Sequence, residues 1–254
     1  MGDVPQPNSA ASLPLWKRCL DFERQDAAHY QDYVHTPLFD LIEDAPSRVL
    51  DLGCATGAFG ATLAQRYPGA SVVGIEAGRA AAQKARERLD RVIDGRLEDM
   101  SFADAGFAPA EFDTVIAADI LEHLTNPWDV LVRLRPFLAP RAQILASIPN
   151  IRNLTVGAPL LLEGRFDYDE RGLLDIGHLR FFTLAGVKRL FEETGYAVER
   201  DIAIILPSLE NVYRSYQGRG LAQVKIGRMT LSDLNAQDLL ELCASQFLIR
   251  ARVR

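Results

Sequence analysis

The chain is poor in cysteine. Its 254 residues include three cysteines, at positions 19, 54 and 243. They are odd in number and far apart, so they form neither a disulfide framework nor the closely spaced pairs of a structural zinc site. This usage is typical of a reducing compartment, and we expect a cytoplasmic protein.

Long apolar runs and an excess of basic residues are also missing. No stretch approaches the roughly 20 apolar residues that a membrane-spanning helix needs. The opening segment, MGDVPQPNSAASLP, lacks the basic and apolar parts of a secretory signal, and we expect residues 1–14 to be a flexible tail. The net charge of −6 disfavours general nucleic-acid binding. We therefore expect a soluble protein with neither a membrane nor a nucleic acid as its partner.

Short apolar runs alternate with helical patterns along most of the chain, which indicates an α/β fold. The length fits one domain over residues 15–254. The expected strands are residues 48–52, 71–76, 91–94, 112–118, 142–149, 196–206 and 245–253. The expected helices are residues 59–67, 79–89, 127–138 and 184–195, the last with Thr183 as its N-cap and Gly195 at its end. We predict a Rossmann-like, doubly wound sheet of seven strands.

The turn after the first strand carries a glycine loop, VLDLGCATGAFG (residues 49–60). Gly53 and Gly57 allow a sharp turn and a close approach of a ligand. Ala55 replaces the second glycine of the dinucleotide fingerprint, and the G-K-[ST] of a phosphate loop is missing. Asp51 ends the first strand, where a carboxylate suits a cationic ligand. Glu76 ends the second strand, where it can accept hydrogen bonds from a ribose diol.

VLDLGCATG followed by VVGIEA (residues 72–77) resembles the first two cofactor motifs of class I S-adenosylmethionine-dependent methyltransferases. The resemblance implies S-adenosylmethionine as cofactor and a sheet whose last strand is antiparallel. In that family the loop holds the methionine part and the acid after the second strand holds the ribose. Many members also have an acid where DGRLED has Arg96, so adenine would instead contact Leu97 and lie near Glu98. The alternative is an α/β fold with a tight turn and no cofactor. The implied cofactor-binding residues are Asp51, Gly53, Cys54, Ala55, Gly57, Glu76, Ala77, Leu97, Glu98 and Asp119.

Two segments do not fit the alternation, and such stretches of about 30 residues are usually lids or binding loops. We therefore divide the domain into an N-terminal cover (15–45), a cofactor-binding core (46–149), an acceptor lid (150–182) and the C-terminal part of the sheet (183–254). Tyr30 and Tyr33 in the cover either cap the cofactor or pack, whereas we expect His29 and His35 at the surface. In the lid, Arg152, Arg165 and Arg180 either grip an anionic acceptor or form ordinary ion pairs.

The hexapeptide DILEHL follows the fourth strand, where ligands of doubly wound folds bind. If it opens a helical turn, Asp119, Glu122 and His123 share one face. Together they would ligate a divalent ion or only order the turn. With SIPN and GHLRFFT, which holds His178, the pattern resembles small-RNA 3′-terminal 2′-O-methyltransferases and, more loosely, ubiquinone-biosynthesis O-methyltransferases. The resemblance implies that Mg²⁺ or Mn²⁺ is held by Asp119, Glu122, His123 and His178. Without metal, His178 or His123 would be the general base, oriented by Glu122 or Asp119.

The run SIPNIRNL…LLLEGRFDYDERGLLDIGHLRFFT most closely resembles methyltransferases of cell-surface polysaccharide and glycan biosynthesis. This resemblance implies O-methylation of a sugar hydroxyl, and a homodimer or a glycosyltransferase partner is compatible with it. The alternatives are a small-molecule O- or N-methyltransferase for a quinone, phenol or natural product, an RNA-end methyltransferase, and a non-catalytic cofactor-binding module.

Overall fold

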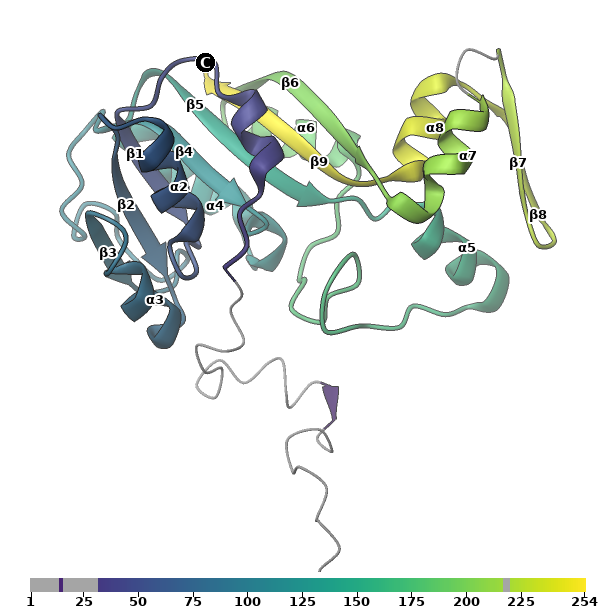
Figure 1. Cartoon of the computed structure of the whole chain (residues 1–254), viewed down its shortest axis with the longest axis horizontal. Helices are drawn as coiled ribbons and strands as arrows, with labels where there is room; N and C mark the ends of the chain where they lie inside the picture. Colours follow the sequence, from purple (N-terminus) through teal and green to yellow (C-terminus); the bar gives the residue numbers. More distant parts are fainter. Residues whose placement is uncertain (1–13, 16–31, 217–219) are drawn as a thin grey trace, which may run out of the picture.

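The computed structural model describes residues 14–15, 32–216 and 220–254 (Figure 1). The predictions for His29, Tyr30 and residues 1–13 lie outside these ranges. Among the described residues, no helix combines the length and apolar character that crossing a bilayer requires.

A seven-stranded sheet in the order β3-β2-β1-β4-β5-β9-β6 forms the centre of the protein. The strands are β1 (Arg48–Leu52), β2 (Ser71–Glu76), β3 (Arg91–Asp94), β4 (Phe112–Ala118), β5 (Leu138–Pro149), β6 (Tyr196–Ile205) and β9 (Ala244–Val253). The first five strands pair in parallel, and β9 is antiparallel to both β5 and β6. This is the Rossmann-like methyltransferase sheet that the sequence predicts, including the antiparallel last strand.

Helices cover both faces of the sheet. They are α2 (Ala58–Arg66), α3 (Arg79–Ala85), α4 (Pro127–Leu134) and α6 (Leu184–Glu193), with the 3-10 helices η1 (Thr36–Leu41), η2 (Leu121–His123) and η3 (Arg135–Phe137). Successive strand residues point to opposite faces. Leu50 and Leu52 of β1 pack in one apolar cluster with α4 and α6, whereas Val49 packs in another with η1 and α2. The strands β1 to β4 and the helices α2 and α3 therefore lie where the local sequence patterns predict them.

The segment between β6 and β9 does not lie wholly in the sheet, although the sequence analysis assigned residues 183–254 to it. It forms η4 (Pro207–Leu209), α7 (Glu210–Tyr216), the hairpin of β7 (Ala222–Ile226) and β8 (Met229–Leu234), and α8 (Ala236–Cys243). With α5 (Leu154–Glu163) these elements build an extension at one end of the molecule (Figure 1). Its own apolar cluster includes Leu154, Val224 and Leu239. The loop between α5 and α6 returns from this extension to the sheet.

Candidate active site

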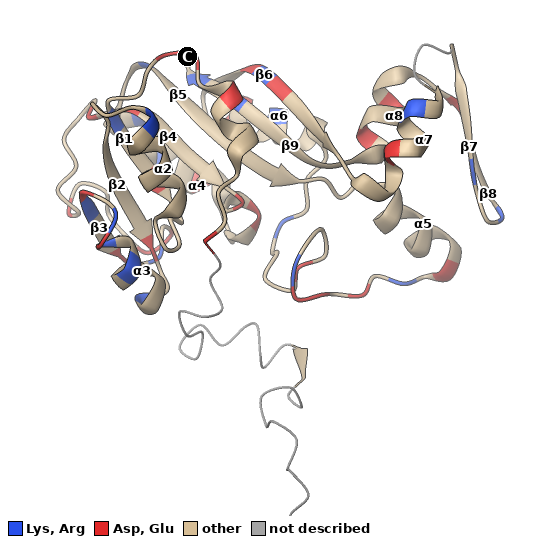
Figure 2. Ribbon diagram, viewed as in Figure 1, with Lys and Arg blue, Asp and Glu red and all other residues tan. Residues whose placement is uncertain are grey.

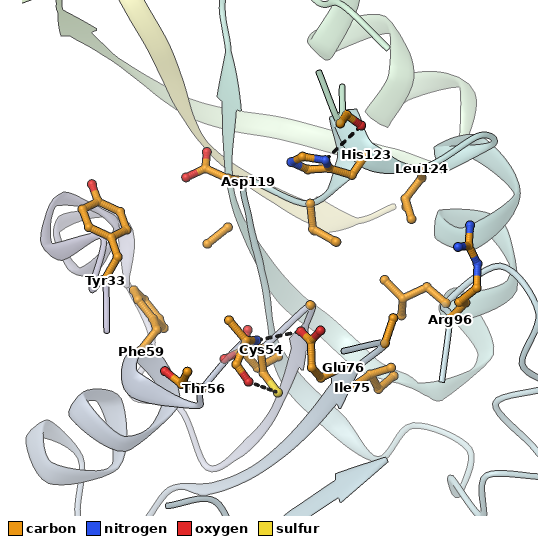
Figure 3. A pocket seen from close by; sticks show the side chains of 18 of the residues that line it. Tyr33, Cys54, Thr56, Phe59, Ile75, Glu76, Arg96, Asp119, His123 and Leu124 are labelled. Carbon is orange, nitrogen blue, oxygen red and sulfur yellow. Dashed lines mark hydrogen bonds between the residues drawn. The ribbon is translucent and has the colours of Figure 1, made fainter. Parts of the chain in front are cut away.

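A cavity of about 410 Å³ opens at the carboxyl ends of β1, β2 and β4 (Figure 3). This is where doubly wound sheets bind their ligands. Most of the expected cofactor-binding residues line it: Asp51, Gly53, Cys54, Ala55, Glu76, Ala77, Leu97, Glu98 and Asp119. Gly57 does not line the cavity. A Cβ on Gly57 would lie 3.1 Å from the Ala85 Cα, so this glycine instead lets α2 pack against α3.

The glycine loop owes its shape to backbone conformations that most residues avoid. Gly53 and Ala55 have φ angles of +67° and +48°. A Cβ on Gly53 would lie 2.7 Å from Ile120 Cδ1, so only glycine fits there. The left-handed Ala55 is held by its own amide, which donates to Glu76 Oε2 at 2.9 Å. Glu76 also accepts from the Gly78 amide at 2.7 Å, so one carboxylate ties the loop to the next turn.

Two buried carboxylates lie on the floor of this cavity. Burial, and then the charge of Glu76, raises the pKa of Asp51 to about 8. Burial also raises the pKa of Glu76, although amide hydrogen bonds oppose that shift. Asp51 Oδ2 has no hydrogen-bond partner among the described residues. A bound cation would relieve this arrangement, because it favours the ionised carboxylates. The Cys54 thiol has its pKa raised by burial, which argues against a nucleophilic role.

The N-terminal cover reaches the cavity at residues 32–35. Asp32 accepts hydrogen bonds from Thr56 Oγ1 at 2.6 Å and from Arg88 at 2.7 Å, which fixes the cover to the glycine loop. Tyr33 lines the cavity beside it. The expectation of a surface position for His35 is wrong: its side chain is buried, because the cover folds back onto β9, where His35 Nε2 lies 3.0 Å from Gln246 Oε1.

Arg96 stands at the rim of the cavity, at the position where the family often has an acid. Its guanidinium lies 3.4 Å from a carboxylate oxygen of Asp99 and 3.7 Å from one of Glu98. Glu98 in turn accepts from the Asn126 amide at 2.8 Å, at the start of α4. The Leu97 side chain is buried at this end of the cavity. These positions leave Leu97 and Glu98 beside the space that the resemblance assigns to adenine.

A second cavity of about 330 Å³ adjoins the first. Asp119 and His123 line both cavities, so they mark the boundary between them. Residues of the lid and the end of β9 form the rest of its wall, among them Leu173, Asp175 and Gln246. Two adjoining cavities with common lining residues could hold two molecules side by side.

Glu122, His123 and His178 come together at this boundary. Ligand atoms of the three side chains all lie within 4.8 Å of one another. The side chain of Glu122 is 1% exposed, and within the described chain neither of its oxygens has a hydrogen-bond partner. Its nearest cationic candidate, His178 Nε2, is 4.0 Å away, which is too far for a hydrogen bond. Burial, followed by the charges of Asp119 and Asp175, raises the pKa of Glu122 well above its ordinary value.

Both histidines are held by backbone carbonyls. His123 Nδ1 lies 3.1 Å from the Gly177 carbonyl oxygen, and His178 Nδ1 lies 3.3 Å from that of Leu173. A carbonyl only accepts, so each Nδ1 donates to it, and in a neutral ring the lone pair then lies on Nε2. Burial and the neighbouring His123 lower the pKa of His178, which favours the neutral ring of that residue. In its neutral form each ring offers Nε2 as a metal ligand or a general base.

Asp119 is outside this three-residue group, although the sequence placed it on the same helical face. DILEHL forms only the short 3-10 turn η2, and Asp119 precedes it with a left-handed φ of +51°. Its Oδ1 accepts from Ser147 Oγ at 2.8 Å and from Gln246 Nε2 at 3.0 Å. The sequence analysis did not single out Ser147 or Gln246. SIPN, which the resemblance includes, could have pointed to Ser147, whereas nothing in the last strand marked Gln246.

The lid arginines are engaged elsewhere. Arg152 pairs with Asp238 and Glu241 of α8 at 2.7 and 2.8 Å. Arg165 pairs with the neighbouring Glu163 and Asp167. Arg180 donates to the carbonyl oxygens of Thr125 and Leu179. The structure therefore favours ordinary pairing of these side chains over the alternative of gripping an anionic acceptor.

A family model described as a methyltransferase domain matches residues 22–200. The chain belongs to this family. It is an S-adenosylmethionine-dependent methyltransferase of the class I fold. The methyltransferase is also similar in fold to an S-adenosylmethionine-dependent methyltransferase from Mesorhizobium loti, with a TM-score of 0.54 and 14% identity over 85% of this chain and 96% of that one.

Curated relatives are methyltransferases for different small acceptors. A ubiquinone biosynthesis O-methyltransferase of Aeromonas salmonicida is 27% identical over 66% of this chain and 70% of its own length. A malonyl-[acyl-carrier protein] O-methyltransferase of Legionella pneumophila is 32% identical over 45% of this chain and 40% of its length. A trans-aconitate 2-methyltransferase of Variovorax paradoxus is 30% identical over 52% of each chain. The chain thus spans about half or less of the length of these last two relatives.

Proposed function

We propose that this methyltransferase O-methylates a small molecule, with S-adenosylmethionine in the first cavity and the acceptor in the second. The relatives' names support a small-molecule acceptor better than the sugar acceptor that the lid resemblance implied. The observation that carries the proposal is the buried Glu122 carboxylate, which has no hydrogen-bond partner among the described residues and lies beside His123 and His178 where the two cavities meet.

The first cavity suits the cofactor in shape and charge. The ionised Asp51 and Glu76 would face its positive charge and its ribose hydroxyls, while the tight turn at Gly53 leaves room for close approach. S-Adenosylmethionine supplies a methyl group on a sulfonium, which an acceptor oxygen displaces in line. The protein's part is to hold that oxygen about 3–3.5 Å from the methyl carbon and to exclude water.

Glu122, His123 and His178 also fit a divalent metal ion. Imidazole nitrogens are common ligands of transition-metal ions, and carboxylates are common ligands of Mg²⁺ and Mn²⁺. A site with one carboxylate and two imidazoles therefore suits a divalent ion. The unpartnered Glu122 oxygens are what such an ion would satisfy, since a buried carboxylate without a partner is costly. A metal there would lower the pKa of an acceptor hydroxyl. Asp119, held by Ser147 and Gln246, would orient the acceptor at the boundary instead of ligating the ion.

The two histidines would accept the acceptor's proton. Each has its Nε2 free and its Nδ1 bonded to a backbone carbonyl, so the proton-accepting nitrogen is fixed in place. A neutral imidazole is a competent base near pH 7. One of the two histidines would play this role without a metal. With a metal bound, the Nε2 lone pairs would ligate the ion, and the ion would instead lower the pKa of the hydroxyl.

A panel of acceptors and a metal titration would test the proposal. Purified protein would be given S-adenosylmethionine with catechols, phenols, quinols, amines and free sugars, and methylated products would be identified by mass spectrometry. We expect turnover of a hydroxyl compound. Methylation confined to sugars would instead favour the glycan acceptor, and methylation confined to amines would contradict O-methylation.

Metal binding would be measured separately from turnover. We expect Mn²⁺ to bind stoichiometrically by calorimetry and to raise the melting temperature, and Glu122→Gln to abolish both effects. Full activity after exhaustive chelation, with no Mn²⁺ binding, would sink the metal assignment while leaving the histidines as bases.

A further inference from the structure

Three carboxylates and two histidines line the acceptor cavity, and no arginine or lysine does among the described residues. The carboxylates belong to Asp119, Glu122 and Asp175, and the histidines are His123 and His178. The other lining residues are Pro149, Gly172, Leu173, Leu206, Ser245 and Gln246. Glu122 gives independent evidence of a ligand site in this cavity. It lines the cavity, its carboxylate is buried, and neither of its oxygens has a hydrogen-bond partner among the described residues.

The carboxylates are fixed in these positions. Asp119 Oδ1 is held by Ser147 and Gln246, as described above. Asp175 Oδ1 accepts from the Gly177 amide at 2.7 Å, in a tight turn of the lid. A Cβ placed on Gly177 would lie 3.1 Å from both Asp175 Oδ1 and His123 Nδ1, so Asp175 lies close beside the metal-binding group. Neither acid can turn away from the acceptor without losing its hydrogen bonds.

No arginine or lysine side chain lines this cavity among the described residues. Arg152 pairs with Asp238 and Glu241 of α8, and Arg180 donates to backbone carbonyl oxygens. Other Lys and Arg residues are spread over the described chain, including the loop between α5 and α6 (Figure 2). The cavity therefore presents acidic side chains to the acceptor with no Lys or Arg beside them in its described lining.

An anionic group on the acceptor would have to approach the side chains of Asp119, Glu122 and Asp175, which all line this cavity. Acidic side chains beside a bound anion disfavour its binding.

We propose that the acceptor cavity selects neutral or cationic hydroxy compounds over carboxylates and phosphates, and that Asp175 is a specificity-determining residue. The inference rests on the proposed function and narrows its substrate class. It separates this methyltransferase from the relative named for trans-aconitate, which is an anion.

A matched series of catechols tests this selection. Dopamine, 3,4-dihydroxyphenylethanol and 3,4-dihydroxyphenylacetate share the reacting diol and differ in the charge of one side chain. We expect kcat/KM of the carboxylate to be at least about tenfold below that of the alcohol, with the amine equal to or above the alcohol. A carboxylate methylated as efficiently as the alcohol would overturn the inference and leave the proposed function intact. If none of the three is methylated while the cofactor binds, the proposed function fails for vicinal diols, and this inference fails with it.

The variant Asp175→Asn isolates the charge. Its amide oxygen can still accept from the Gly177 amide, so the turn should persist. We expect the ratio of kcat/KM for the carboxylate to that for the alcohol to rise about threefold to tenfold, since one fixed charge is removed. Asp167→Asn is the matched control, because Asp167 lies in the same lid, pairs with Arg165 and does not line the cavity. An unchanged ratio in Asp175→Asn, or an equal rise in both variants, would contradict the role of Asp175.

Discussion

The two cavities are built in different ways. The cofactor cavity is made mainly by consecutive residues at three strand ends, and its shape comes from the backbone of one glycine loop. The acceptor cavity is assembled from side chains of η2, the lid and the distant β9. The first therefore depends on local backbone geometry and the second on contacts between segments far apart in the chain. Substitutions should affect the two halves in distinguishable ways.

The largest effect is expected in the acceptor half, from Glu122→Gln. The substitution preserves shape but removes the buried carboxylate that would ligate the metal. We expect kcat to fall by about 10²–10⁴-fold while the dissociation constant for S-adenosylmethionine changes less than about twofold. Steady-state kinetics and calorimetry would measure the two quantities. If the dissociation constant for S-adenosylmethionine rose by as large a factor as kcat fell, the two cavities would not be functionally separate.

A glycine comparison tests the backbone argument. Gly53 and Gly172 both have left-handed φ angles, of +67° and +92°, and each lines one cavity. A Cβ would clash with Ile120 at Gly53 and would meet no atom within 4 Å at Gly172. We expect Gly53→Ala to lower the free energy of unfolding by about 3 kcal/mol and Gly172→Ala by about 1 kcal/mol. Denaturant titration would measure both, and equal losses would remove the distinction.

Glu76→Ala should act on the cofactor half alone. It removes the hydrogen bonds expected to the ribose, so we expect the dissociation constant for S-adenosylmethionine to rise about tenfold to a hundredfold. At saturating cofactor, kcat should stay within a few-fold of the wild type. Because Glu76 also holds the Ala55 and Gly78 amides, Glu76→Gln is the control that keeps an acceptor oxygen. A large loss of kcat with unchanged cofactor affinity would contradict this assignment.

The smallest expected effect is a pH dependence of stability that comes from Asp51. Its pKa is raised to about 8 in the folded protein, above its ordinary value of 3.8. The stability it contributes is therefore fully present at low pH and is lost as the pH rises through 8. We expect the melting temperature of the cofactor-free protein to fall less between pH 5 and pH 8 in Asp51→Asn than in the wild type. Identical slopes would mean that Asp51 is ionised throughout.

The sequence predicts the cofactor half well because its signals are local. The bounds of β1, β2, β3 and β4 are those expected from short apolar runs, and the loop between β1 and α2 carries its own glycines. The helix expected at residues 79–89 is shorter in the structure, where α3 ends at Ala85. The chain after it turns toward β2, where Asp90 accepts a hydrogen bond from the Val72 amide. The position and type of α3 are nonetheless as predicted.

The acceptor half was predicted only in part, because its signals are not local. Glu122, His123 and His178 do come together, but Asp119 does not join them, since η2 is a single tight turn. His35 and Gln246 are 211 residues apart, and no local pattern indicates that they meet. The extension formed by η4, α7, β7, β8 and α8 was missed because its own apolar cluster is made mainly by these short elements and α5.

The position of β9 has a consequence for synthesis of the protein. This strand lies between β5 and β6 and supplies Gln246 to Asp119. A nascent chain on the ribosome can pair β1 to β5 as they emerge, but β6 has no neighbour until residues 244–253 follow. The proposed site for methyl transfer is thus among the last parts of the enzyme to form, and a chain that ended before this strand would lack Gln246 as a partner for Asp119 and part of the wall of the second cavity.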